Sequence, residues 1–578
     1  MKTIKKIAPA ILLILLTVTC QKNILDISPQ DKIAEDAVWS DAALIRAYQN
    51  ELYNSELHGF YIMWYSKYTD EAYNSVACCG GDLFKLNTYN PDNIGQLGAG
   101  SGNGGFWSSG NGYMYYWDRG YTYIRKINVF LEKMQEITVD LPDKDVLVAE
   151  AKFLRAFIYF NLIERFGGVP IVKESYELSD ADQVEFTRNT FDECVTFIVQ
   201  DLTEAKAVLP ARYVSTDANY GRATGDACQA LLSRLYLYAA SPLFSPTKDM
   251  AKWQKAADAA EALLNSGYSL YPDYQKLFEL HQGDAQDEVI FSRGFTSSSG
   301  VNIAHDNLNR RFEANGGWWG SNGPSGNLID DYDMANGEPP FMPDGSINPA
   351  SGYDPQHPWD NRDPRLEATV IHDGSVFRPD LDPTHPTFEM WIAEDGSSWG
   401  YDSYKNTGDN PRTNTVVKKF MPEEGPINGS TPTTNQYPFF RLAEIYLNYA
   451  EAEFELGDEA MAREYVNKVR RRPSVNLPDI PASVTGEDLR RRIYNERRIE
   501  LAFESHRFFD VRRWKIATTV ENTKIYTYDI YKDLTTGAKR YEKVILLDKS
   551  GTFPEYKSLL PIAQDEILRT GLTQTPGY

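Results

Sequence analysis

The sequence has few of the residues that metal and redox sites need. Among 578 residues there are 5 cysteines and 7 histidines, and no Cys-x-x-Cys motif occurs. The histidines are scattered, without the HxH or HxxxH spacing that brings two imidazoles to one metal ion, and neither HExxH nor a P-loop is present. The sequence therefore predicts no cofactor, and it leaves a bridge between Cys194 and Cys228 undecided.

Positive charge is also scarce. The chain has 59 Lys and Arg against 81 Asp and Glu, a formal net charge of −22. A field of this sign repels phosphate backbones, which argues against a nucleic acid as partner.

Aromatic residues are abundant instead, with 36 tyrosines and 11 tryptophans. Because these rings combine an apolar face with a polar edge, their surplus indicates a binding surface.

Long hydrophobic runs are missing. The apolar run at residues 7–16 is too short to span a bilayer and follows Lys2, Lys5 and Lys6, as in a secretory signal peptide over residues 1–19. Cys20 at the expected cleavage site predicts a lipid anchor, although Thr17 and Thr19 depart from the usual residues of a bacterial lipobox. The alternative is a secreted protein with a coincidental cysteine.

The remaining sequence predicts a mainly α-helical fold. Trp117, Tyr121, Ile124 and Asn128 share one helix face, and the pair of helices at 441–456 and 459–471 has alanines where the two must approach closely. This unit resembles a tetratricopeptide (TPR) helical hairpin. Further helices are predicted at 146–166, 190–209, 224–240, 250–265 and 486–511, with strands at 288–291 and 415–420 and a non-helical tail.

Several motifs, in order along the chain, carry a family resemblance. They include the leader CQKNILDISPQD, WDRGYTYIRKIN, EAKFLRAFIYFNLIERFGGVPIV, GPSGNLIDDYDMANG, NRDPRL, YPFFRLAEIYLNYAEA and NERRIELAFESHRFFDVRRW. Together they resemble the SusD/RagB family of outer-membrane lipoproteins of Bacteroidetes. The resemblance runs over nearly the whole mature chain.

The resemblance implies a non-catalytic protein on the outer face of the outer membrane, held there by a lipid. It would cover a SusC-like TonB-dependent transporter, bind a glycan and pass it inward. The fold would be a TPR-like scaffold with a long loop-rich insertion carrying short strands. The expected organisation is a signal peptide (1–19), a lipidated leader (20–60), a helical region with binding loops (61–295), a loop-rich ligand-binding region (296–437) and a C-terminal helical region (438–578).

Exposed aromatic rings next to amides or carboxylates are what a glycan site requires, because sugars offer C–H faces and hydroxyls. Trp318 and Trp319 are the first candidates, since they lie among five glycines with Asn322 nearby. Trp117 and Trp514 are expected in the core. A second, glycine-rich loop supplies further candidates, and Asp70 is added by analogy with the family. These further candidates are Tyr89, Trp107, Tyr113 and Tyr115.

Residues 493–514 alternate arginines with carboxylates, which could bind an anion or form an internal strut. On a helix, Arg492 with Glu496, Arg497 with Glu500, Glu504 with Arg507, and Asp510 with Arg513 are neighbours. We therefore expect a self-neutralised structural element.

Two other function classes stay open. A glycoside hydrolase needs two carboxylates at a fixed separation, and a chain this acidic always offers some pair. A purely structural adaptor, or a protein with peptide cargo, is also compatible with a TPR-like scaffold. The acidic run LIDDYDMANG (328–337) could hold a structural Ca²⁺, but it lacks the EF-hand spacing and is expected to be a solvated loop.

Overall fold

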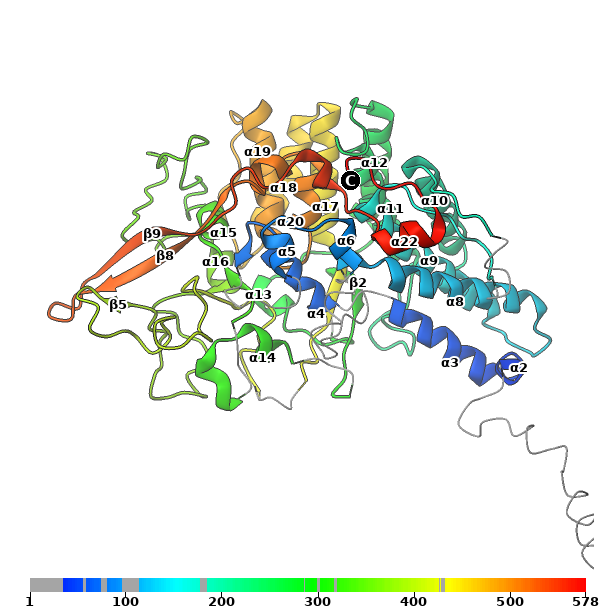
Figure 1. Ribbon diagram of the computed structural model, residues 1–578, viewed down its shortest axis with the longest axis horizontal. Helices are drawn as coiled ribbons and strands as arrows, with labels where there is room; N and C mark the ends of the chain where they lie inside the picture. The colour runs from blue at the N-terminus through cyan, green and yellow to red at the C-terminus, as the bar shows by residue number, and fades with distance from the viewer. Residues whose placement is uncertain are drawn as a thin grey trace, which may run out of the picture.

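The structure is a computed structural model that describes residues 35–55, 59–73, 81–95, 114–176, 184–284, 286–298, 302–315, 320–425, 427 and 432–578. Its body consists of long helices packed side by side in sequence order (Figure 1). The predicted helical class is confirmed. These long helices are α8 (Trp117–Glu136), α9 (Lys144–Phe166), α10 (Phe191–Lys206), α11 (Gly225–Ala240), α12 (Met250–Leu264), α17 (Leu442–Leu456), α18 (Glu459–Arg470) and α19 (Gly486–Glu500).

Local sequence signals explain where these helices begin and end. Thr190 caps α10 and shares a capping box with Glu193, and Asp249 accepts hydrogen bonds from the first turn of α12. Helix α17 stops at Gly457, whose φ of 99° is the left-handed conformation that glycine adopts without strain. Ala450 and Ala462 are fully buried where α17 meets α18, as predicted for a close helical hairpin.

Shorter elements fill the space between the long helices. The short helices are α2 (Glu35–Val38), α3 (Ala42–Leu52), α4 (Gly59–Ile62), α5 (Gly81–Lys85), α6 (Pro91–Ile94), α13 (Tyr274–Leu277), α14 (Ile303–Asn307), α15 (Gly326–Asp331), α16 (Pro364–Thr369), α20 (Arg507–Arg513), α21 (Ala517–Val520) and α22 (Gln564–Thr570). Short 3₁₀ helices are η2 (Tyr53–Ser55), η3 (Met63–Tyr68), η6 (Arg310–Asn315) and η7 (Glu555–Ser558).

The strands form small sheets that join distant parts of the chain. β1 (Ala72–Tyr73) pairs with β3 (Gly323–Pro324), β2 (Val289–Arg293) with β7 (Tyr437–Arg441), and β4 (Val370–Ile371) with β6 (Val416–Val417), each pair antiparallel. Strands β2 and β6 confirm the two predicted strands in position, although β6 is shorter than expected.

The predicted non-helical tail contains a long hairpin. β8 (Lys524–Lys532) and β9 (Lys539–Asp548) pair antiparallel, and β5 (Ile392–Ala393) adds a parallel strand beside β8. The hairpin extends from the helical body at the left of Figure 1. A short helix, α22, follows it. The predicted non-helical tail is therefore confirmed except at the short helices α21, η7 and α22. The hairpin itself was not predicted, because none of β9 is buried and it lacks the apolar alternation by which strands are recognised.

The predicted helix at 486–511 is interrupted. α19 ends at Glu500, and α20 begins at Arg507. Between them Phe503 and Ser505 have positive φ angles of 61° and 73°, a conformation that ends a helix. No glycine or proline marks this break. The backbone nitrogen of Phe503 instead donates a hydrogen bond to the carboxylate of Glu71 at 3.3 Å, so a tertiary contact accompanies the turn.

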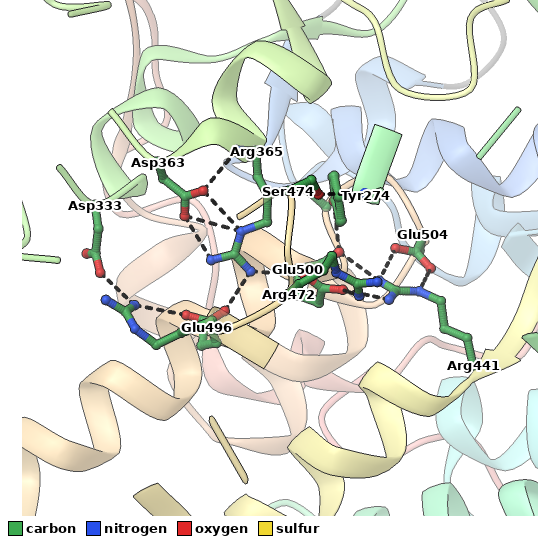
Figure 2. A network of polar contacts seen from close by, with 12 residues as sticks. Tyr274, Asp333, Asp363, Arg365, Arg441, Arg472, Ser474, Glu496, Glu500 and Glu504 are labelled. Carbon is green, nitrogen blue, oxygen red and sulfur yellow. Dashed lines mark hydrogen bonds and ion pairs between the residues drawn. The ribbon is translucent and has the colours of Figure 1, made fainter. Parts of the chain in front are cut away.

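Glu500 at the end of α19 is the centre of a buried network of ion pairs (Figure 2). It contacts Arg365 of α16 at 3.0 Å, Arg441 of β7 at 2.7 Å and Arg472 after α18 at 2.6 Å. All four side chains are at most 1% exposed. Each charge is taken out of water, but every one faces opposite charges and hydrogen bonds, which offsets the cost of its burial.

The expectation that residues 493–514 form an internal strut is confirmed, but most of its pairings differ from the prediction. Only Asp510 with Arg513 pairs as expected, at 2.8 Å. Arg497 also contacts Asp510, while Arg507 contacts Asp70 across more than 400 residues of sequence. The helix break separates Glu504 from Arg507, whereas the two predicted pairs inside α19 are lost because their members pair with residues of other elements.

Other predictions about the core have clear outcomes. Trp117 and Trp514 are buried as expected, at 2% and 5% exposed. Cys194 and Cys228 are buried free thiols, so no bridge joins them. Among the described helices, none has the length and apolar character needed to cross a membrane.

Candidate functional site

Part of the predicted site cannot be placed. Trp318 and Trp319, Trp107 and Tyr113 all lie outside the described residues, and so does the predicted lipid anchor, Cys20. Their assignment stays a prediction.

Tyr89 and Tyr115 are predicted glycan contacts that the structure places in the core. Tyr89 is fully buried, and its hydroxyl donates to the carbonyl of Lys557 at 3.0 Å. Tyr115 is 1% exposed and packs edge-on against Phe166, while its hydroxyl accepts from the nitrogen of Ala563 at 2.8 Å. With the rings enclosed and both hydroxyls partnered, neither can stack on a sugar. The prediction is wrong for these two residues.

Asp70 and Asn322 are also structural. The carboxylate of Asp70 is 4% exposed and receives both Nε and Nη2 of Arg507 at 2.9 Å, with Arg498 at the same distance. Asn322 is fully buried and donates to Asn307 at 2.7 Å. These groups are enclosed by protein, so their prediction as ligand contacts is also wrong.

The residues on both sides of the segment 316–319 are firmly held. Gly320, directly after the segment, donates to the carbonyl of Leu308 at 3.1 Å. Asn309 and Arg311 both bind the buried carboxylate of Asp402, each at 2.9 Å. The described residues that flank positions 316–319 therefore share a base with the segment around residue 402.

That base carries exposed aromatic rings. Trp399 is 44% exposed and Tyr401 39% exposed. The segment that holds them runs antiparallel to residues 389–392, with Gly400 donating to the carbonyl of Trp391 at 2.9 Å. Residues two apart on an extended segment project from the same face, so both rings lie on one side. We call His385, Trp399 and Tyr401 the aromatic edge.

Two of the rings of the aromatic edge, His385 and Tyr401, are held in position by their neighbours. His385 stacks on Tyr401, with centroids 3.9 Å apart and an interplanar angle of 5°. The guanidinium of Arg311 donates to the carbonyls of His385 and Thr387 and also binds Asp402, next to Tyr401 in sequence. One buried arginine thus fixes both partners of the stack. The arrangement offers preformed flat apolar surfaces, which suit a ligand with a flat C–H face.

A second ring lies three residues further on. Tyr404 is half-buried beneath the guanidinium of Arg412, 3.9 Å from the ring centroid, and Arg412 pairs with Asp529 of β8 at 2.9 Å. Nearby Arg310 is exposed and pairs with Asp409 at 3.0 Å. Polar groups that can hydrogen-bond hydroxyls therefore surround the aromatic edge.

Sequence reasoning missed the aromatic edge. The signal was present in EDGSSWGYDSYKN, where Trp399, Tyr401 and Tyr404 follow glycine and serine in a polar stretch. This is the same pattern that led to Trp318 and Trp319, but the rings are spaced out instead of adjacent.

The segment GSSWG (396–400) has the spacing of the GxSxG nucleophile motif. In hydrolases that motif occupies a sharp turn from a strand into a helix. Here the segment follows β5, and Gly400 pairs back with Trp391, so an extended segment follows the serine in place of a helix. The structural setting of a nucleophile elbow is absent from this segment.

The acidic run at 328–337 does not form a cation site in the described structure. Asp331 pairs with Arg498, Asp333 with Arg470 at 2.9 Å, and Asp330 with Lys543. Nowhere in the described ranges are three His, Cys, Asp or Glu side chains grouped to hold a metal ion. The expectation of a solvated acidic loop is wrong in detail, because Asp333 is buried within ion pairs.

Two protein-family models match the chain. The model described as "SusD family" matches residues 287–578, slightly more than half of the chain. The chain belongs to the SusD family. A second model, described as "Starch-binding associating with outer membrane", matches residues 24–237.

Named members of the SusD family align over much of the chain. SusD-like protein P2 of Formosa agariphila is 26% identical over 420 residues, which are 70% of this chain and 72% of that protein. The starch-binding protein SusD of Bacteroides thetaiotaomicron is 25% identical over 417 residues, 68% of this chain and 69% of that protein.

Solved structures extend the similarity to almost the whole chain. A SusD-like protein of Bacteroides fragilis is 27% identical with a TM-score of 0.74, over 95% of this chain and 100% of that one. A SusD-like carbohydrate-binding protein of the same species is 25% identical with a TM-score of 0.70, over 92% and 99%. The predicted family and fold are confirmed.

Proposed function

We propose that this protein binds a glycan at the cell surface and delivers it to a SusC-like TonB-dependent transporter. The observation that carries the proposal is the near full-length match to a SusD-like carbohydrate-binding protein. The exposed rings of the aromatic edge, beside the base of the Trp318–Trp319 segment, support the same function.

The binding step follows from the chemistry of the site. The rings of Trp399 and Tyr401 are open to solvent, and His385, whose carbonyl accepts a hydrogen bond from Arg311, holds the Tyr401 ring at a fixed orientation. A sugar that stacks on them loses little side-chain entropy from the protein, because the rings are already ordered. Arg310 and the hydroxyl of Tyr401 can hydrogen-bond sugar hydroxyls. This role needs no reaction, and we propose that the protein is not an enzyme.

We further propose that Cys20 carries a lipid that holds the protein on the outer face of the outer membrane. The expected result is that wild-type protein partitions with membranes and that Cys20→Ala releases it into the soluble fraction. Release of both proteins alike would contradict the anchor. Co-purification with a TonB-dependent transporter tests the delivery step separately.

Native electrophoresis through gels that contain starch, laminarin, xylan or mannan tests glycan binding directly. Retardation by one polysaccharide, without new reducing ends, is the expected result. New reducing ends would instead indicate a glycoside hydrolase. Failure on every gel would favour peptide cargo or a purely structural role.

Two double variants then test the site. Trp399→Ala with Tyr401→Ala, and Trp318→Ala with Trp319→Ala, should each raise Kd at least tenfold, a loss of about 1.4 kcal/mol. Tyr556→Ala is the matched control, because Tyr556 is an exposed ring (42%) far along the chain in η7. Unchanged affinity in both double variants would show that the glycan binds elsewhere.

A further inference from the structure

The helical body contains a pocket of about 520 Å³ that lies away from the aromatic edge. It opens between the α10–α11 loop, the α12–α13 loop and strand β2. Four half-buried tyrosines from the two loops line it: Tyr213, Tyr220, Tyr268 and Tyr271. The volume is in the range of small-molecule sites and fits one or two sugar rings.

Two of the rings have fixed positions. The guanidinium of Arg212 lies 5.4 Å over the ring of Tyr268 and donates to the carbonyl of Gly267 at 3.2 Å. The side-chain amide of Gln286 donates to the hydroxyl of Tyr220 at 3.3 Å, and its oxygen accepts from two backbone nitrogens at the start of β2. The walls of the pocket are therefore built by side chains that other contacts orient.

Other polar groups of the pocket are free to bind a ligand. The side-chain hydroxyls of Tyr213, Ser215 and Ser269, and the carboxylate of Asp287, make no hydrogen bond or ion pair with any residue in the described ranges. They lie around a space lined by aromatic rings. Hydroxyl and carboxylate groups beside rings form the combination that recognises a polyol with an apolar face.

The charged side chains that line the pocket indicate an uncharged ligand. Arg222 reaches the pocket, but its guanidinium is bound to Glu150 at 2.7 Å. That leaves one guanidinium, Arg212, and one carboxylate, Asp287, among the lining residues, so the pocket has no excess of either sign. An uncharged sugar fits this balance better than a uronic acid or a sulfated sugar, for which several cations would be needed.

We propose that this tyrosine pocket is a second carbohydrate-binding site, for one or two neutral sugar residues of the same glycan. The proposal rests on the proposed glycan-binding function. β2, the floor of the pocket, lies near the middle of Figure 1, whereas β5, next to the aromatic edge, lies far to the left. Two separate sites on one chain raise the apparent affinity for a long polysaccharide beyond that of either site alone.

Calorimetric titration with maltohexaose, laminarihexaose, xylohexaose and mannohexaose tests the proposal. The wild-type protein should bind one of these with two sites per chain. Tyr213→Ala with Tyr268→Ala should weaken one site at least fivefold. Because that variant removes two packed rings, Ser215→Trp is the second test: it keeps all four tyrosines and places a large ring in the cavity. Val208→Ala, an exposed change on the same loop outside the pocket, is the control.

The outcomes separate this proposal from the general function. If Trp318→Ala with Trp319→Ala leaves one site that Ser215→Trp then removes, the pocket is supported. If the wild-type protein binds one hexasaccharide per chain and both pocket variants behave like wild type, the pocket is overturned while glycan binding stands. If no hexasaccharide and no polysaccharide binds, glycan binding itself fails and the pocket proposal fails with it.

Discussion

Asp70 shows how a residue chosen as a ligand contact serves the fold. Burial by itself would raise the pKa of the Asp70 carboxyl, but the charges of Arg498 and Arg507 outweigh burial and hold the pKa well below its usual range. A carboxylate with a lowered folded pKa stabilises the protein above its unfolded pKa, and this stability is lost as the pH falls through the folded value.

Asp70→Asn should therefore lower the free energy of unfolding by about 3–5 kcal/mol at pH 7, because buried Arg507 loses its carboxylate partner and Arg498 keeps only Asp331. Urea unfolding measures this, with the exposed Asp140→Asn as control, expected within about 0.5 kcal/mol of wild type. If the Asp70→Asn protein is as stable as wild type but no longer binds the glycan, Asp70 is a ligand contact after all.

The pKa of Glu71, the next residue, is shifted in the opposite direction. It is 1% exposed, and burial, together with the charge of Asp70, raises its pKa to about 7 despite Arg498 and Arg507. The folded state then holds a proton that the unfolded state has released, so the stabilising contribution is complete below about pH 4.3 and is lost as the pH rises through 7.

Glu71→Gln tests this titration. As the pH rises from 5 to 8, ionisation of Glu71 should lower the free energy of unfolding of the wild-type protein by on the order of 2 kcal/mol. The glutamine variant has no group that titrates at this position, so its free energy of unfolding should lack this decrease. Urea unfolding at several pH values gives both curves. Parallel curves for the two proteins would mean that Glu71 is already ionised in the folded state.

The types of residue in a segment do not show whether its aromatic side chains lie on the surface or in the core. Tyr89 and Tyr115 stand beside a glycine-rich segment, as Trp399 and Tyr401 do, yet the first pair is buried by residues 557 and 563 and the second is open to solvent. The burying residues are more than 400 positions away in sequence. No local pattern contains that information.

At the scale of elements, the ion pairs of Glu500 in the last turn of α19 connect this helix to three other parts of the fold. Glu500 joins α16, β7 and the segment after α18 through Arg365, Arg441 and Arg472, and among the described residues it is the one carboxylate that pairs with all three of these arginines. Burial would raise the pKa of Glu500, but Arg472, Arg441 and Arg365 hold it well below the usual range. The carboxylate is thus ionised throughout the ordinary pH range, and its charge holds the elements together.

Glu500→Gln should cost about 3–5 kcal/mol of unfolding free energy, because an uncharged amide leaves an excess of buried positive charge. Glu487→Gln on the same helix, with a side chain 68% exposed, is the matched control and should change stability by only about 0.5 kcal/mol. Thermal and urea unfolding report both. Equal stability of the two variants would show that the network contributes little.

Elements with strong local signals were predicted well. α10, α12 and α17 carry a cap or a terminal glycine at the sequence positions where they begin or end, and their predicted bounds are within three residues. The end of α19 was missed because Phe503 and Ser505 adopt left-handed backbone angles that no local residue type indicates. The hairpin of β8 and β9 was missed because mixed polar and apolar residues on β9 give no clear period.

At the scale of the whole molecule, the segment after the hairpin closes the N-terminal part. Asn87 donates to Thr552 at 2.9 Å, Tyr89 to Lys557 at 3.0 Å, and Ala563 to Tyr115 at 2.8 Å. These contacts connect residues near 90 and 115 with the last 30 residues. The two parts therefore share one core, and neither is complete without the other.

Removing residues 553–578 should destabilise the entire protein by roughly 5 kcal/mol or more, a large part of the stability of a typical domain. The loss follows from exposing the buried aromatic rings of Tyr89 and Tyr115 to water. Circular dichroism and limited proteolysis measure it, with Leu568→Ala as a control at a position 77% exposed. A truncated protein that melts like wild type would mean that the N-terminal part folds independently.

The ion pair between Asp70 and Arg507 has a consequence for the order of synthesis. The two residues are separated by 437 positions, so the ribosome adds Asp70 to the chain long before it adds Arg507. A nascent chain of 500 residues has no Arg507 and no α20, and the pocket around Asp70 stays open to water. Native burial of the part around Asp70 must therefore wait for the last elements, and this part is open to aggregation until synthesis is nearly complete.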